Sequence, residues 1–130
     1  MTVGLPTVGS SVVGVELVSE QVVGSTIVRV LRVHDEATGL EGHFPGFAIV
    51  PGIVQIQWAL DAAGRLAGHP PELRRLETLK FKAVIRPGQR VELAVELSAT
   101  GDAMHFRIGC GERTFSSGRC VLRQPLLPAS

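Results

Sequence analysis

The first part of the chain alternates between apolar and polar residues with a period of about two, which is typical of strands with one buried face. β-Branched residues dominate it, as in the segment Thr26–Val33. We predict strands over Ser11–Val18 and Gln21–Val33, after a loose lead-in over residues 1–10. The polar stretch His34–Gly42 follows, and its composition predicts a turn or a long loop.

A different pattern follows, in which almost every residue is apolar for about four helical turns. We predict a helix over Gly52–Leu66, ended by Gly68 and the prolines that follow it. Only Gln55, Gln57 and Asp61 interrupt its apolar surface near the middle, so we expect a core helix enclosed by a sheet and by a partner. Each of the three needs a partner, because an unpaired buried polar group costs roughly 1–3 kcal/mol.

The C-terminal half returns to strand-like patterns separated by glycine-containing turns. Five or six strands and one buried helix predict an α+β fold in which an antiparallel sheet wraps around a long central helix. A chain of 130 residues supports one hydrophobic core, so we expect a single domain over residues 1–130. The predicted C-terminal strands are Leu73–Ile85, Arg90–Ala99, Ala103–Gly109 and Arg113–Arg123.

Charge and cysteine content narrow the class of protein. The formal net charge is +1 and no block of Lys or Arg occurs, which argues against nucleic acid or an anionic membrane as a main partner. The sequence shows neither a signal peptide nor eighteen consecutive apolar residues, so we expect a cytoplasmic protein. In that compartment Cys110 and Cys120 are expected as buried or half-buried free thiols, although a disulfide between adjacent strands is conceivable. Their spacing is not that of a metal site.

The loop before the helix carries the most informative residues. His43 is followed by Phe-Pro-Gly, and Pro51-Gly52 opens the helix. The prolines fix φ and exclude helix within the loop, whereas the glycines permit close backbone approach. One titratable ring is thereby placed beside a helix N-terminus, whose unpaired N–H groups attract negative charge. Such an arrangement can polarise a carbonyl group.

The run His-Phe-Pro-Gly-x-x-x-x-Pro-Gly resembles the hotdog-fold 3-hydroxyacyl-acyl-carrier-protein dehydratases of fatty-acid synthesis and their relatives in polyketide and aryl-polyene pathways. A weaker resemblance covers most of the remaining chain, including Leu79-Lys80-Phe81-Lys82 and Arg86-Pro87-Gly88. It implies a dimeric hotdog enzyme that dehydrates 3-hydroxyacyl thioesters to trans-2-enoyl thioesters without a metal or soluble cofactor. The substrate would be carried on the phosphopantetheine of acyl carrier protein. We expect the family's short N-terminal helix to be missing here, and Ala48 stands where the family loop usually has proline.

The resemblance assigns roles to the residues of the motif. His43 would be the base that removes the C2 proton, and the backbone N–H of Gly52 would stabilise charge on the thioester oxygen. Gln57 occupies the position of the family's catalytic carboxyl group, and Asp61 stands where the family often has glutamine. A carboxamide cannot transfer a proton at pH 7.

Two interpretations of Asp61 follow. It can act as the acid through a water or a repositioned substrate, because a carboxyl group in an apolar wall can keep its proton near neutral pH. It can instead be a carboxylate paired with Arg65 at i+4.

Further candidates would contact the substrate or its carrier. Aromatic side chains near the helix start would line an acyl tunnel, although core packing is the alternative for each of them. Basic side chains around one strand and turn would meet phosphopantetheine phosphate or an acidic carrier protein, and solvated surface positions are the alternative. The tunnel candidates are Phe44, Phe47, Pro51 and Trp58, and the basic candidates are Lys80, Lys82 and Arg86.

Two alternative functions stay open at this point. Because Gln57 replaces the expected carboxyl group, the chain can be a non-catalytic hotdog subunit that pairs with an active dehydratase in a heterodimer instead of a homodimer. An acyl thioesterase is the other alternative, in which Asp61 activates water against a carbonyl polarised by Gly52. The reaction product distinguishes these functions.

Overall fold

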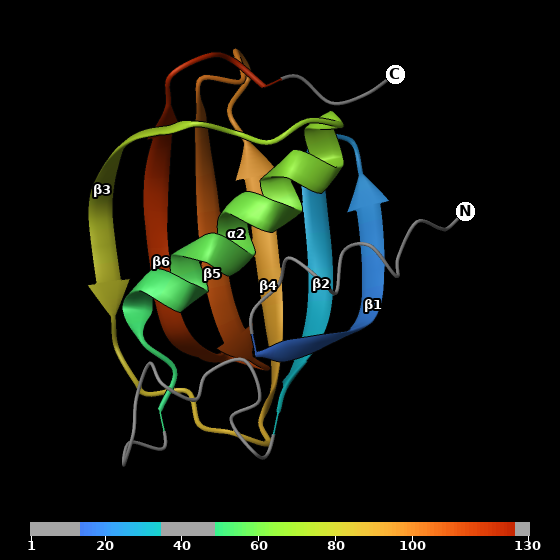
Figure 1. Cartoon of the computed structure of the whole chain (residues 1–130), viewed down its shortest axis with the longest axis vertical. Helices are drawn as coiled ribbons and strands as arrows, with labels where there is room; N and C mark the ends of the chain where they lie inside the picture. Colours follow the sequence, from blue (N-terminus) through green and yellow to red (C-terminus); the bar gives the residue numbers. More distant parts are fainter. Residues whose placement is uncertain (1–13, 35–48, 127–130) are drawn as a thin grey trace.

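The computed structural model describes residues 14–34 and 49–126, and in this part of the chain six strands form one antiparallel sheet with the order β1-β2-β4-β5-β6-β3 (Figure 1). One helix, α2, crosses the sheet diagonally. The strands are β1 (Val15–Val23), β2 (Thr26–Val33), β3 (Leu73–Phe81), β4 (Arg90–Leu97), β5 (Ala103–Cys110) and β6 (Arg113–Leu122), and the helix is α2 (Gly52–Ala67).

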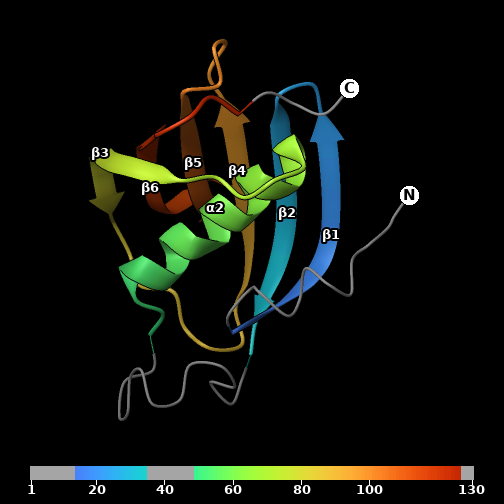
Figure 2. The ribbon, with the colours of Figure 1, turned by 45° about the horizontal axis from the view of Figure 1, so that its top comes forward.

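The core lies between the inner face of the sheet and the helix. The tilted view separates the two layers and shows α2 on one side of the curved sheet only (Figure 2). Alternate residues of the strands point inward and are buried, as Ile27, Leu31, Leu93 and Val95 show. The predicted α+β hotdog arrangement, an antiparallel sheet wrapped around one long helix, is confirmed.

The helix ends close to where the sequence predicts. It begins at Gly52, as expected, and ends at Ala67, one residue beyond the prediction. Gly68 follows with a φ of 87° and donates its N–H to the carbonyl of Gly64 at 2.8 Å. This left-handed residue satisfies one of the unpaired carbonyl groups at the helix end. At the start, Pro51 is the N-cap and provides no side-chain hydrogen bond.

The turn of the first hairpin was predicted at the wrong place. The first strand was predicted to end at Val18, but β1 continues to Val23, and the chain turns at Gly24 with a φ of 60°. The expected break near residues 19 and 20 is instead a β-bulge, where the register shifts between Leu17 and Ser19. The bulge changes the parity of the strand and directs Glu20 to the inner face, opposite Arg29.

The third predicted strand is too long. β3 ends at Phe81, and the following residues leave the sheet, where Ile85 accepts a hydrogen bond from the N–H of Val50 at 2.8 Å. The register between β3 and β6 also shifts between Glu77 and Lys80, around Thr78 with its positive φ of 48°. A bulge in an edge strand interrupts pairing, which a pattern of apolar residues does not reveal.

Two predictions from composition can be compared with the structure. Cys110 and Cys120 are both free, as expected; Cys120 is buried, but Cys110 is exposed and not buried or half-buried as predicted. Burial raises the pKa of the Cys120 thiol to about 11 because desolvation disfavours the thiolate.

In the described part of the chain, no helix has the length and apolar character needed to cross a membrane.

Candidate active site

The start of α2 is shaped by a close contact with β3. A Cβ atom placed on Gly52 would lie 2.6 Å from Cζ of Phe81, well inside van der Waals distance. Gly52 is not among the glycines with positive φ, so the contact with the ring is what requires a residue without a side chain. The N–H groups of Val54 and Gln55 both point to the carbonyl of Pro51, at 3.1 and 3.2 Å. The N–H of Gly52 comes before these bonds and has no acceptor within the helix.

One face of α2 points away from the sheet. Ile53, Gln57 and Asp61 are spaced four residues apart and form a row along the helix, which starts on this face and reaches the border with the sheet at Asp61. Ile53 is 62% exposed and Gln57 is exposed, while the Asp61 side chain is 23% exposed. The expected polar pair is thus present in one row, but within this chain the sheet partly encloses Asp61 and leaves Gln57 exposed. A partner, as the sequence analysis expects, would have to cover this face.

Asp61 is held by an arginine from the sheet. Nη1 of Arg29, in the middle of β2, donates to Oδ2 of Asp61 at 2.7 Å, and Nε of the same guanidinium donates to Glu20 at 2.9 Å. The pairing of Asp61 with Arg65 that the sequence allowed is not formed, since Arg65 donates to the other oxygen of Glu20 at 3.0 Å. The side chains of Asp61, Arg29, Glu20 and Arg65 therefore form a chain of alternating negative and positive charges that links the C-terminal half of α2 to β1 and β2. We call these four residues the Arg29 cluster.

Arg29 was not among the predicted site residues, although the sequence contains a signal for it. Arg29 shares the parity of Ile27 and Leu31 in the alternating strand, so the pattern already places it on the buried face. It is 1% exposed. A charged residue at a core position of a strand requires an opposite charge nearby, and Asp61 is the acidic residue of the apolar helix. Their proximity could have been inferred from these two facts.

The other predicted site residues are dispersed. Trp58 is fully buried and packs in the core. Gln55 is buried, as expected, and its Nε2 donates to the carbonyl of Val50 at 3.1 Å. Lys80, Lys82 and Arg86 are exposed at the end of β3 and in the turn after it. His43, Phe44 and Phe47 lie outside the described residues, as does the expected long loop.

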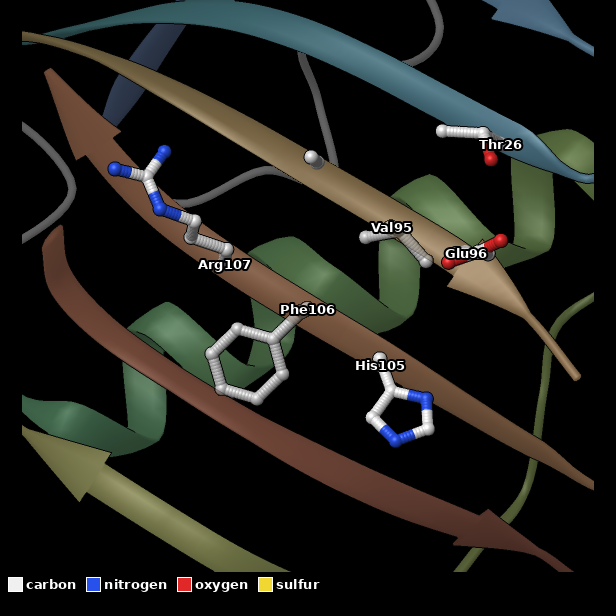
Figure 3. A pocket seen from close by; sticks show the side chains of 7 residues that line it. Thr26, Val95, Glu96, His105, Phe106 and Arg107 are labelled. Carbon is white, nitrogen blue, oxygen red and sulfur yellow. The ribbon is translucent and has the colours of Figure 1, made fainter. Parts of the chain in front are cut away.

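A shallow depression of about 190 Å³ lies on the opposite face of the sheet. Figure 3 shows it with the helix behind the strands, and its labelled polar side chains include Glu96, His105 and Arg107. Glu96 and His105 face each other across β4 and β5. Because the sheet separates this depression from Gly52 and Asp61, it takes no part in the candidate active site.

A curved antiparallel sheet around one helix, with an uncapped helix start and polar groups on the outward helix face, defines a hotdog-fold protein. The chain belongs to the ApeI-like dehydratase family, since the model of that family, described as ApeI dehydratase, matches residues 19–119. The match contains α2, most of β1 and the whole of β2 to β5. The resemblance found in the sequence is thereby confirmed at the level of the family.

Individual relatives agree with this assignment. The chain is 32% identical over 96 residues to a 3-hydroxyacyl-[acyl-carrier-protein] dehydratase FabZ from Oenococcus oeni, with 68% of each chain covered. The dehydratase heterocomplex ApeI:P from Xenorhabdus doucetiae has a similar fold, with a TM-score of 0.75 and 22% identity over 85% of this chain and 98% of that one. A hypothetical thioesterase from Streptococcus pneumoniae, solved with coenzyme A, has a TM-score of 0.64 at 8% identity, covering 95% and 96%, which shows the shared fold alone.

Proposed function

We propose that this protein removes water from 3-hydroxyacyl thioesters carried on acyl carrier protein and produces trans-2-enoyl thioesters. The match to the dehydratase family over residues 19–119 carries this proposal. The name of the Oenococcus oeni relative supports the choice of substrate class. The reaction needs only proton transfer and stabilisation of an enolate oxygen, so we propose that it uses no soluble cofactor beyond the phosphopantetheine of the carrier.

The proposed mechanism starts at the uncapped end of α2. The thioester oxygen accepts a hydrogen bond from the N–H of Gly52, and the helix dipole adds to the stabilisation of negative charge there. His43 takes the proton from C2. The C3–O bond breaks as the C2–C3 double bond forms, and the departing hydroxide takes up a proton and leaves as water. The remaining question is which group supplies that proton.

Gln57 can orient the leaving hydroxyl group but cannot protonate it at pH 7. Asp61 lies one turn further along the same helix face, about 5.4 Å away along the axis, and can act only through a water or a shifted substrate. Its Oδ2 accepts a hydrogen bond from Nη1 of Arg29 at 2.7 Å, which engages this oxygen with β2. We therefore favour a donor other than Asp61, such as a carboxyl group of a second hotdog subunit.

Because neither Gln57 nor Asp61 is favoured as the proton donor, a second candidate function is that of one subunit in a paired dehydratase. The uncovered helix face and the end of β3 carry exposed apolar side chains, which a second subunit would bury. The solved ApeI:P heterocomplex supports pairing between different subunits. Light scattering should give twice the chain mass of 13.8 kDa for a homodimer, and a monomer alone would favour an obligate heterodimer. The exposed apolar residues concerned are Ile53, Leu76, Phe81 and Val84.

The decisive experiment follows the mass of a 3-hydroxyacyl acyl-carrier-protein thioester incubated with the purified protein. Loss of one water supports the dehydratase, and release of the free acid would support the thioesterase alternative. An unchanged substrate that loses water only after a second hotdog subunit is added supports the paired enzyme. Absence of any reaction in both cases would reject the proposed function.

We also propose that the carrier protein docks beside the helix start. Phe81 packs against Gly52, and its chain neighbours Lys80 and Lys82 are exposed cations. A Lys80→Glu, Lys82→Glu double variant should raise KM for the carrier-bound substrate, with a much smaller effect on a small thioester. Arg123→Glu is the control, because Arg123 is exposed beside the other end of β3. Equal effects of both variants would contradict this docking site.

A further inference from the structure

Gln55 carries a buried amide in the first turn of α2 that the proposed mechanism does not use. The residue is 3% exposed, and its Nε2 donates to the carbonyl of Val50 at 3.1 Å. Val50 is buried as well, and its N–H donates to the carbonyl of Ile85 at 2.8 Å. Both backbone polar groups of Val50 are therefore bonded, one to the helix and one to the segment after β3.

The bond from Gln55 takes the place of a helix cap. Pro51 is the N-cap and provides no side-chain hydrogen bond, so no ordinary cap fixes the chain where it enters the helix. Gln55 instead reaches back from the first turn to the residue that precedes the cap. The chain that enters α2 is thus held at Val50.

This bond constrains the direction of the Gly52 N–H. That N–H belongs to the trans peptide unit that it forms with the carbonyl of Pro51, and the two groups point in opposite directions. The carbonyl is held by the N–H groups of Val54 and Gln55, at 3.1 and 3.2 Å. The peptide unit before Pro51 carries the Val50 carbonyl, which the Gln55 side chain holds. Both peptide units that flank the proline are therefore fixed, and the Gly52 N–H is fixed with them.

The oxygen of the same amide indicates that the bond contributes direction more than stability. Within residues 14–34 and 49–126, Oε1 of Gln55 is buried and has no hydrogen-bond partner. The opposite orientation of the amide is unfavourable, because Oε1 would then face the Val50 carbonyl and both atoms are acceptors. An unpaired buried acceptor offsets the gain from the bond through Nε2. An apolar side chain at this position should therefore cost little stability.

We propose that Gln55 is a positioning residue that directs the N–H of Gly52 toward the thioester oxygen, acting through the carbonyl of Val50. This catalytic role rests on the proposed function, whereas the ordering of the helix start does not. A donor stabilises developing negative charge only when it points to the oxygen in the transition state, and binding of the unreacted thioester depends less on it. Loss of the Gln55 amide should therefore slow turnover more than it weakens substrate binding.

The first measurement compares kcat with KM for the carrier-bound thioester. Gln55→Met removes the donor and keeps an unbranched side chain, and it should lower kcat about 10–100-fold with KM changed less than about threefold, because a misdirected group can cost about 10²-fold. Ile56→Val is the matched control, since Ile56 is the next helical residue, is 4% exposed and has no polar side-chain atom. It should lower Tm and leave kcat within about twofold of the wild type. Wild-type kcat in Gln55→Met, or equal losses in both variants, would overturn the proposal.

Amide hydrogen exchange tests the ordering of the helix start without substrate. The N–H of Val50 should exchange at least about tenfold faster in Gln55→Met, with amides in the middle of α2 unchanged, because a local opening affects only nearby groups. Unchanged exchange at Val50, or a uniform increase along the helix, would contradict the proposed role of Gln55. If the wild type shows no dehydration, only the proposed function fails, and the exchange at Val50 still decides whether Gln55 orders this segment.

A second substitution covers the case in which Gln55→Met does not fold. Gln55→Leu also lacks a donor, and leucine has a high helix propensity and suits a buried helical position. It should show the same loss of kcat and the same faster exchange at Val50. If neither variant folds, the amide is required for folding itself, and the positioning role is wrong.

Discussion

Gly52→Ala tests why a glycine begins the helix. The new Cβ would lie 2.6 Å from Cζ of Phe81, and the shortest ordinary contact is 3.4 Å, so the ring must retreat by about 0.8 Å. Overpacking of this kind costs about 1–3 kcal/mol. Phe81 is 47% exposed and can move partly into solvent, so we place the cost at the low end, about 1–2 kcal/mol. Replacing glycine by alanine in a helix returns up to about 1 kcal/mol. The net destabilisation should therefore be small but measurable.

The same substitution should behave differently once the ring is removed. In a Phe81→Ala background the clash is absent, so Gly52→Ala should be neutral or stabilising, and the two sites should couple by about 1–2 kcal/mol. Thermal unfolding of the four proteins measures this, because 1 kcal/mol corresponds to roughly 3–5 °C in Tm for a chain of this size. Gly64→Ala serves as a helical control, since its Cβ would meet Pro71 at 3.2 Å, a milder contact. An equal cost of Gly52→Ala in both backgrounds would refute the idea that Phe81 imposes the glycine.

Three further predictions concern catalysis and the thiols. His43→Ala should abolish dehydration while circular dichroism and Tm stay close to the wild type, because loss of a general base typically costs 10²–10⁴-fold; more than about a tenth of the activity remaining would be inconsistent with that role. Gln57→Glu should raise turnover if the missing helix carboxyl group limits the reaction, and unchanged turnover would indicate a donor already in place. At pH 8 a thiol reagent should modify only Cys110 in the native protein and also Cys120 after unfolding, because burial raises the pKa of the Cys120 thiol to about 11; rapid labelling of both native thiols would contradict this.

Local pattern was sufficient for most of the elements. A period of two marked the strands, and a mostly apolar segment that stops at Gly68 marked the helix, because both signals depend only on neighbours in the chain. The errors fell on irregularities of the sheet. The β1 bulge and the early end of β3 arise from pairing with β2 and β6, partners that the local pattern does not identify.

The sequence alone identified the helix start and the pair Gln57 and Asp61 on one helix face, since i to i+4 spacing follows from helix geometry. It did not identify the residue that contacts Gly52 or the residue that pairs with Asp61. Phe81 lies 29 residues after Gly52 and Arg29 lies 32 residues before Asp61, and only the packing of α2 across the sheet brings each pair into contact. The hydrogen-bond partner of Asp61 therefore depends on tertiary packing, because residues far apart in the chain meet only when the helix lies across the sheet.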